Sequence, residues 1–178
     1  WIDGQMHLSN VFQQYRVLKN GPDEAVFEVQ YAWDDLSGNY SETRRFTLQA
    51  GSQLFKVESQ IFKDGKPAQV SVAIGVTTHD KKALPYADSQ RRWVAAWETL
   101  NGQGLGTGVV LPDAVDSSIL TITSYEKDHS HILFITPTSH DGRITYYGGF
   151  GWEGAGEISS IGAWRSYLTH FSNEHANK

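Results

Sequence analysis

Three neighbouring stretches decide the fold: SETRRFTLQ (Ser41–Gln49), QLFKVESQIF (Gln53–Phe62) and QVSVAIGVTTH (Gln69–His79). In each of them apolar and polar residues alternate, which is typical of a β-strand with one face against a core. Glycine-containing turns, Ala50-Gly51 and Asp64-Gly65, separate the stretches, and Asp-Gly is a strong hairpin signal. This region therefore predicts a three-stranded antiparallel meander.

The predicted meander has an apolar side and a polar side. With the turns centred on the two dipeptides, Phe46 faces Phe55. Phe55 then faces Ile74, and Val57 faces Val72. The other side collects polar and small residues: Arg45, Lys56, Glu58, Gln60, Gln69, Ser71, Ala73, Gly75, Thr77 and His79. Such a surface suits the floor of a cleft for a polar ligand, although a solvated sheet face has a similar composition.

Short β-type runs and turns continue on both sides of the meander. Upstream of the meander, Phe12–Lys19 and Glu24–Trp33 are predicted to form a hairpin. Downstream of it, four single strands are predicted: Gly108–Leu111, Ile119–Glu126, His131–Thr136 and Arg143–Trp152. The segment Arg91–Leu100 fits either a strand or a short helix. This succession of strands and turns predicts an all-β fold, an antiparallel sandwich or barrel.

The C-terminal segment changes to a helical period. Ser159 or Ser160 can cap a helix, and one face of that helix carries Ile161, Trp164, Leu168 and Phe171. We expect the apolar face of this helix to dock on the sheet and close the domain.

Length and charge limit what the chain can do. Its 178 residues contain no linker-like tract, so we expect a single domain over residues 1–178. Because the chain starts at Trp1 rather than at a methionine, it also fits a fragment of a longer precursor. A net charge of −5 without a basic run argues against nucleic acid as a partner. No apolar run approaches the roughly 18 residues of a membrane span, so no membrane partner is expected.

Metal and phosphate sites find little support. There is no cysteine, which excludes disulfides, thiolate catalysis and cysteine-zinc sites. None of the seven histidines stands in a zinc-protease spacing. The glycine-rich stretch Gly102–Gly108 lacks the lysine and the following helix of a phosphate-binding loop, and alternate glycines in a strand more often allow close packing. We expect neither a metal nor a cofactor.

Aromatic residues point towards carbohydrate. They make up 12% of the chain, with six tryptophans and eight tyrosines. Rings of this kind stack on the apolar faces of sugars while their polar tips form hydrogen bonds, although β-rich cores also contain many aromatic residues. Trp97 and Trp152 are the candidate stacking platforms.

Four side chains are candidates for chemistry. His79, followed by Asp80, ends the polar side of the meander, and histidine can act as a general acid or base near neutral pH. Arg44 and Arg45 point to opposite faces, and a guanidinium can bind a carboxylate or sulfate in a bidentate way. Arg45 lies diagonal to Glu58 in the predicted register, so a cross-strand ion pair is an equally good reading. Tyr147 could transfer a proton if neighbouring positive charge lowered its pKa, although a packed strand residue is the commoner role.

Four segments together resemble a known family: SETRRFTL (residues 41–48), VAIGVTTHD (72–80), NGQGLGTGVV (101–110) and YYGGFGW (146–152). They are similar to a bacterial family of unknown function that occurs in polysaccharide-utilisation gene sets, one branch of which includes a dehydratase acting on ulvan oligosaccharides. The resemblance covers nearly the whole chain and implies the C-terminal half or so of a longer protein. It implies a β-sandwich of the galactose-mutarotase-like (supersandwich) type and a secreted or periplasmic location.

These observations lead to an expected function. We expect a lyase or dehydratase that acts on uronic-acid-containing or sulfated oligosaccharides by proton abstraction and elimination. His79 and Tyr147 would transfer protons, and Arg45 would neutralise the substrate carboxylate. Substrate contacts would come from Arg44, Glu58, Trp97 and Trp152. The alternatives are a non-catalytic carbohydrate-binding domain and a sugar epimerase.

Overall fold

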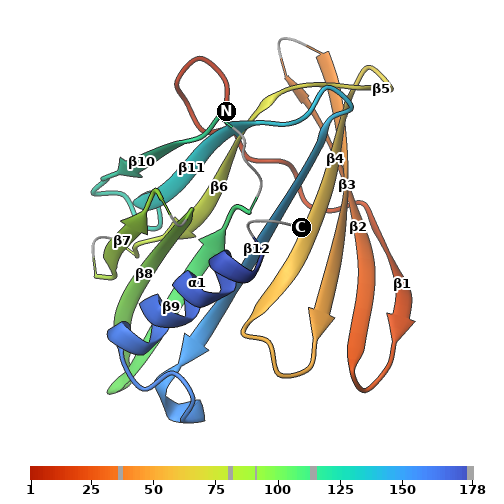
Figure 1. Cartoon of the computed structure of the whole chain (residues 1–178). Helices are drawn as coiled ribbons and strands as arrows, with labels where there is room; N and C mark the ends of the chain where they lie inside the picture. Colours follow the sequence, from red (N-terminus) through yellow and green to blue (C-terminus); the bar gives the residue numbers. More distant parts are fainter. Residues whose placement is uncertain (36–37, 80–81, 91, 113–115, 176–178) are drawn as a thin grey trace.

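The computed structural model describes residues 1–35, 38–79, 82–90, 92–112 and 116–175 (Figure 1). The strands are β1 (Gln14–Asn20), β2 (Glu24–Asp35), β3 (Gly38–Gln49), β4 (Leu54–Lys63), β5 (Lys66–Pro67), β6 (Ser71–Thr77), β7 (Leu84–Asp88), β8 (Trp93–Leu100), β9 (Gln103–Val110), β10 (Ser118–Ile122), β11 (His131–Pro137) and β12 (Arg143–Trp152). A 3-10 turn, η1 (Glu153–Ala155), and helix α1 (Ile161–His175) end the chain.

Two antiparallel sheets form a sandwich. The large sheet has the strand order β1-β2-β3-β4-β12-β9-β8-β7, with β5 paired to β4, and the small sheet has the order β10-β11-β6. In Figure 1 the small sheet lies at the upper left, and α1 crosses in front of β8 and β9. The predicted all-β sandwich with a C-terminal helix is confirmed. The segment Arg91–Leu100, which fits either a strand or a helix by its sequence, forms strand β8. Its first residue, Arg91, lies outside the described residues.

The first hairpin of the predicted meander is confirmed with a corrected register. Phe46 pairs with Val57 rather than with Phe55, because a four-residue loop, residues 50–53, separates β3 from β4. Gly51 takes a positive φ of 79° in that loop, a conformation that suits glycine. The rings of Phe46 and Phe55 remain neighbours, with centroids 6.0 Å apart.

The third predicted strand forms, as β6, but its predicted pairing beside β4 is wrong. The Asp64-Gly65 turn does form a hairpin, but only Lys66–Pro67 continues along β4. From Gln60 to Leu54 the free edge of β4 is instead taken by β12, which pairs there over seven residues. Ser71–Thr77 therefore crosses to the small sheet and pairs with β11. The predicted contacts of Ile74 with Phe55 and of Val72 with Val57 are replaced by this pairing.

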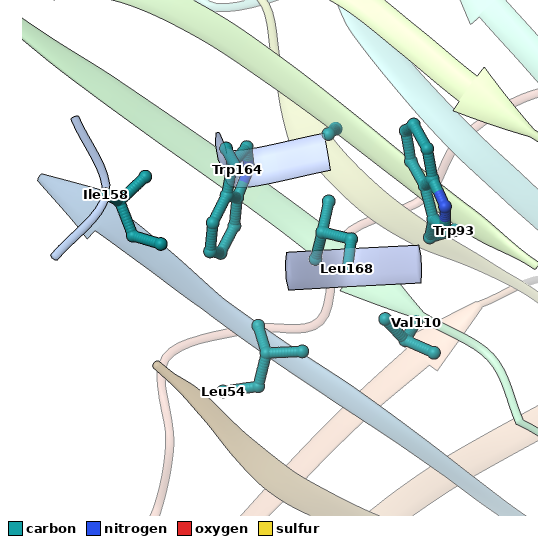
Figure 2. Packing of buried hydrophobic residues seen from close by; sticks show 7 residues of the cluster. Leu54, Trp93, Val110, Ile158, Trp164 and Leu168 are labelled. Carbon is teal, nitrogen blue, oxygen red and sulfur yellow. The ribbon is translucent and has the colours of Figure 1, made fainter. Parts of the chain in front are cut away.

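The large sheet has two differently covered faces. We call the face towards the small sheet the sandwich face; its core contains Ile74, Val94, Val109, Leu111, Ile132, Phe134 and Ile144. We call the opposite face, which α1 covers, the helix face; its core contains Leu54, Trp93, Ala95, Val110, Ile158, Trp164 and Leu168 (Figure 2). The helix and the small sheet each cover only part of a face. Side chains on the uncovered parts are therefore the candidates for a functional site.

The glycine-rich stretch serves packing on the helix face. A Cβ atom built at Gly106 would lie 2.4 Å from Trp164 Cδ1, and one at Gly108 would lie 3.1 Å from Leu168 Cδ1. The missing side chains let the helix approach β9 closely. Ser160 caps the helix, because its Oγ accepts a hydrogen bond from the Ala163 amide at 3.2 Å. The structural interpretation of these glycines and the predicted cap are thus confirmed.

Candidate functional site

A cleft lies on the sandwich face. It has a volume of about 380 Å³ and is bounded by strands β3, β4 and β12, by β6 of the small sheet and by residues 1–9. Its polar and aromatic lining includes His7, Trp33, Tyr40, Glu42, Arg44, Ser59 and Tyr146. Because both sheets and the N-terminal segment line the cleft, it exists only in the assembled domain.

A buried ionic cluster forms the floor of this cleft. Glu42 is only 5% exposed. Its Oε1 accepts hydrogen bonds from Arg44 Nε at 2.9 Å and from Ser59 Oγ at 2.5 Å, and its Oε2 accepts one from Arg44 Nη2 at 2.7 Å. Strand alternation and the pairing of Arg44 with Ser59 place all three side chains on the same face. The Glu42 carboxylate therefore fixes the position of the guanidinium.

Arg44 retains donors for a ligand. A guanidinium has five N–H groups, and Glu42 uses two of those of Arg44; the other three bond no other residue in the described part of the chain. The guanidinium also lies over the ring of Tyr31, 4.9 Å from its centroid. Burial by itself lowers the pKa of Arg44, but Glu42, Tyr146 and Tyr31 outweigh it and hold that pKa above its ordinary value. Arg44 is thus a permanent, half-buried cation in the cleft.

Tyr146 offers a hydroxyl beside this cation. Burial raises the pKa of the Tyr146 hydroxyl above its ordinary value of 10.0, and Arg44 only partly offsets that rise. The hydroxyl accordingly stays protonated at neutral pH. It forms no hydrogen bond with another described residue, so it can donate one to a ligand.

Aromatic rings form another part of the cleft wall. Trp33 and Tyr40, on paired strands β2 and β3, are stacked with ring centroids 5.6 Å apart and an interplanar angle of 7°. His7, from the N-terminal segment, lines the same cleft. Histidine is the side chain best suited to take up and release protons near neutral pH. The cleft therefore combines a fixed cation, a protonated hydroxyl, an imidazole and flat apolar surfaces.

Arg45 and Glu58 lie on the helix face, away from this cleft. Arg45 donates to Glu28 Oε1 at 2.7 Å through Nη2, and Arg16 donates to Glu28 Oε2 at 2.7 Å. Glu58 pairs with Arg45 in the strand register but accepts its hydrogen bond from Lys56, at 2.9 Å. Arg45 is thus in a cross-strand ion pair, with Glu28 as the partner.

Tyr147 is also on the helix face. Its ring lies 4.9 Å from those of Phe171 and His175, both on α1. It packs against the core that includes Trp164 and Leu168. The neighbouring residue, Tyr146, is the tyrosine that reaches the cleft.

His79 lies at the far end of the sandwich face. Its Nδ1 is 2.5 Å from Oε1 of Glu98, a carboxylate that is 7% exposed. Glu98 pairs with Leu105, which pairs with Trp152. Trp152 is six residues from Tyr146 along β12, about 20 Å at the usual rise per residue. His79 therefore cannot act on the same sugar ring as Tyr146; Asp80, its neighbour in sequence, lies outside the described residues.

The two candidate tryptophans have different environments. Trp97 faces α1 and packs against the helix-face core, and a Cβ at Gly104 would lie 2.2 Å from its Cζ2. Trp152 is on the sandwich face and 48% exposed. Of the seven residues proposed from the sequence, only Arg44 lines the cleft.

Glu42, Ser59, Tyr146 and His7 were not among the residues proposed from the sequence. Strand alternation carried a signal for Glu42, because it precedes Arg44 by two positions and must share its face. Tyr146 and His7 depend on contacts between distant segments, which alternation does not report.

Among the described residues no group of three or more His, Asp or Glu side chains could hold a metal ion. No helix in the described part of the chain is long and apolar enough to cross a membrane.

Comparisons with known proteins agree on the relationship. Residues 1–178 match a family described as a domain of unknown function, DUF4861. An uncharacterized protein P7 from Formosa agariphila is 26% identical over 175 residues, which cover 97% of this chain and 43% of that protein. The chain thus spans less than half the length of the relative. The chain belongs to the DUF4861 family.

Proposed function

We propose that this domain binds acidic oligosaccharides in the sandwich-face cleft and processes them by proton abstraction and elimination. The observation that carries the proposal is the half-buried guanidinium of Arg44, which Glu42 fixes in place while three of its N–H groups remain available. A carboxylate or sulfate is the ligand that such a fork binds best. The stacked pair Trp33 and Tyr40 supports a sugar as the body of that ligand.

The elimination assigns one task to each group. Arg44 binds the carboxylate of a uronic acid and stabilises the negative charge that develops when the neighbouring carbon loses its proton. His7 takes that proton, and the C–H electron pair becomes the new C=C bond. The C–O bond on the next carbon breaks, and its electron pair leaves with the oxygen. The Tyr146 hydroxyl donates its proton to this oxygen, and exchange with water restores both side chains.

The pKa shift of Tyr146 supports its role as the acid. A hydroxyl whose pKa is raised stays protonated and is available to a leaving oxygen. The same shift disfavours the phenolate, so proton abstraction is assigned to the imidazole of His7. This assignment replaces the trio His79, Tyr147 and Arg45, which the fold does not bring together.

One observation favours binding without chemistry. Glu42 neutralises Arg44 within the protein, which weakens the stabilisation that Arg44 can give to the negative charge developing during proton abstraction. A domain that only binds sugars would hold acidic oligosaccharides in the same cleft and release them unchanged.

We place either activity in the periplasm or outside the cell, as the family resemblance implies. Ulvan fragments are the first substrates to try, for the same reason.

A panel of pectin-, alginate- and ulvan-derived oligosaccharides tests the proposal. Unsaturated products absorb ultraviolet light, so turnover can be followed directly. We expect Tyr146→Phe to slow elimination by about 100-fold, the usual worth of a general acid, and Tyr147→Phe to leave it unchanged. Equal rates in the two variants would remove Tyr146 from the mechanism. Binding by calorimetry without any product by mass spectrometry would favour the binding domain.

A further inference from the structure

A row of exposed aromatic side chains continues the sandwich face beyond the cleft. On β12, residues at alternate positions share a face, so Phe150 and Trp152 stand on the same side as Tyr146. Phe150 is 57% exposed and Trp152 48%. Exposed apolar side chains that lie next to one another on one face mark a candidate site for a ligand or partner.

Phe55 connects this row with the cleft. It pairs with Gly148, which lies between Tyr146 and Phe150 on the same face of β12. A Cβ atom at Gly148 would meet the ring of Phe55 first, at 3.7 Å, so that ring lies over the position where β12 has no side chain. Three rings, Phe55, Phe150 and Trp152, therefore lead away from Tyr146; we call them the aromatic track.

Polar groups accompany the track. Phe150 pairs with Thr107, whose side chain is half-buried on the same face. At the far end, Trp152 is followed across the sheet by Leu105 and then Glu98, which holds His79. Rings flanked by hydroxyl and imidazole groups suit a ligand with apolar faces and polar edges, which describes a pyranose.

We propose that the aromatic track is an extended binding surface for the sugar residues that follow the acidic residue bound at Arg44. The inference rests on the proposed function for the chemistry of its ligand. It adds that the ligand is a chain of several residues, since the track runs about 20 Å from Tyr146 to Trp152. Continuity with the cleft on a single strand favours this occupant over an unrelated partner.

Oligosaccharides of two, four and six residues, prepared from pectin, alginate and ulvan, test the track by calorimetry. In the wild-type chain we expect affinity to rise with length. Trp152→Ala and Phe150→Ala should each lower the affinity for the hexasaccharide by about tenfold and leave the disaccharide unaffected. Tyr125→Ala is the matched control, because Tyr125 is a 97% exposed ring outside the sheets. Thermal melting of each variant verifies that it is folded.

Arg44→Gln separates the two proposals. It should lower affinity at every length, because the acidic residue is lost from the cleft. If Trp152→Ala and Phe150→Ala bind the hexasaccharide as the wild type does, the track is overturned while the cleft stands. If the wild-type chain binds no oligosaccharide of any length, the proposed function and the track both fail.

Discussion

Two pairs of consecutive residues show how differently the two faces of the large sheet are used. Arg44 and Tyr146 enter the cleft on the sandwich face, whereas Arg45 and Tyr147 lie on the helix face. Arg44 is held by a single buried carboxylate, Glu42; Arg45 shares a second buried carboxylate, Glu28, with the exposed Arg16. The Tyr146 hydroxyl bonds no other residue in the described part of the chain, and Tyr147 is packed under α1. One residue along a strand thus separates a cleft-lining position from a structural one.

The difference arises from what covers each face. On the helix face, α1 fills the space over β8 and β9 with large apolar side chains. On the sandwich face, the small sheet covers β8 and β9 and leaves strands β2–β4 open. The helix face is also open over β2–β4, where Arg45 is half-exposed, but on the sandwich face β6 and residues 1–9 enclose the open part as the cleft.

The largest effect should come from the helix-face core. Trp164 is fully buried against Gly106, so Trp164→Ala removes the ring that holds α1 to the sheet. We expect a loss of about 3–5 kcal/mol in the free energy of unfolding, measured by urea denaturation. Trp152→Ala, on the exposed part of the sandwich face, is the control and should cost less than about 1 kcal/mol. Equal losses would mean that α1 does not stabilise the sheet in this way.

The two arginines should differ in stability. Arg44→Gln leaves the buried carboxylate of Glu42 without its cation, and we expect a loss of about 1–3 kcal/mol. Arg45→Gln should cost less than about 1 kcal/mol, because Glu28 keeps its bond to Arg16 and Arg45 is half-exposed. Chemical denaturation of both variants at neutral pH measures the difference. A larger loss for Arg45→Gln would contradict the assignment of the buried pair.

A smaller, pH-dependent effect should distinguish the helix face. Hydrogen bonds from Arg45 and Arg16 hold the pKa of Glu28 below its ordinary value of 4.5. A carboxyl with a lowered pKa in the folded state stabilises the fold above its unfolded pKa, and that stability is lost as pH falls through the folded value. Glu28→Gln should therefore flatten the decline in stability below about pH 4.5. If the stability of Glu28→Gln declines at acid pH as steeply as that of the wild type, Glu28 is not the group whose protonation destabilises the fold.

The sequence predicted the strands and the alternation of faces well, because both are local properties. It placed Arg44 and Arg45 on opposite faces of their strand, and Tyr146 and Tyr147 on opposite faces of theirs, as the structure has them. It could not show which of these faces would be covered. That depends on where α1 docks and on β12 taking the edge of β4, contacts between segments some 90 residues apart.

The same limit explains the position of His79. In the predicted meander, Ser71–Thr77 extended the sheet beside β4, which would have brought His79 near the polar residues of that strand. The strand pairs with β11 instead and delivers His79 to Glu98. Side-chain chemistry suggested plausible catalytic residues, but the tertiary arrangement decides which of them meet.

Calorimetric titration of an acidic tetrasaccharide into the wild-type chain, Arg44→Gln and Arg45→Gln tests the central claim most directly. The two variants lose the same charge at adjacent positions and differ only in the face concerned. We predict that Arg44→Gln weakens binding by about tenfold or more, as expected for a lost charged hydrogen bond, while Arg45→Gln binds like the wild type. Weakened binding in Arg45→Gln together with unchanged binding in Arg44→Gln would place the ligand on the helix face and contradict the account.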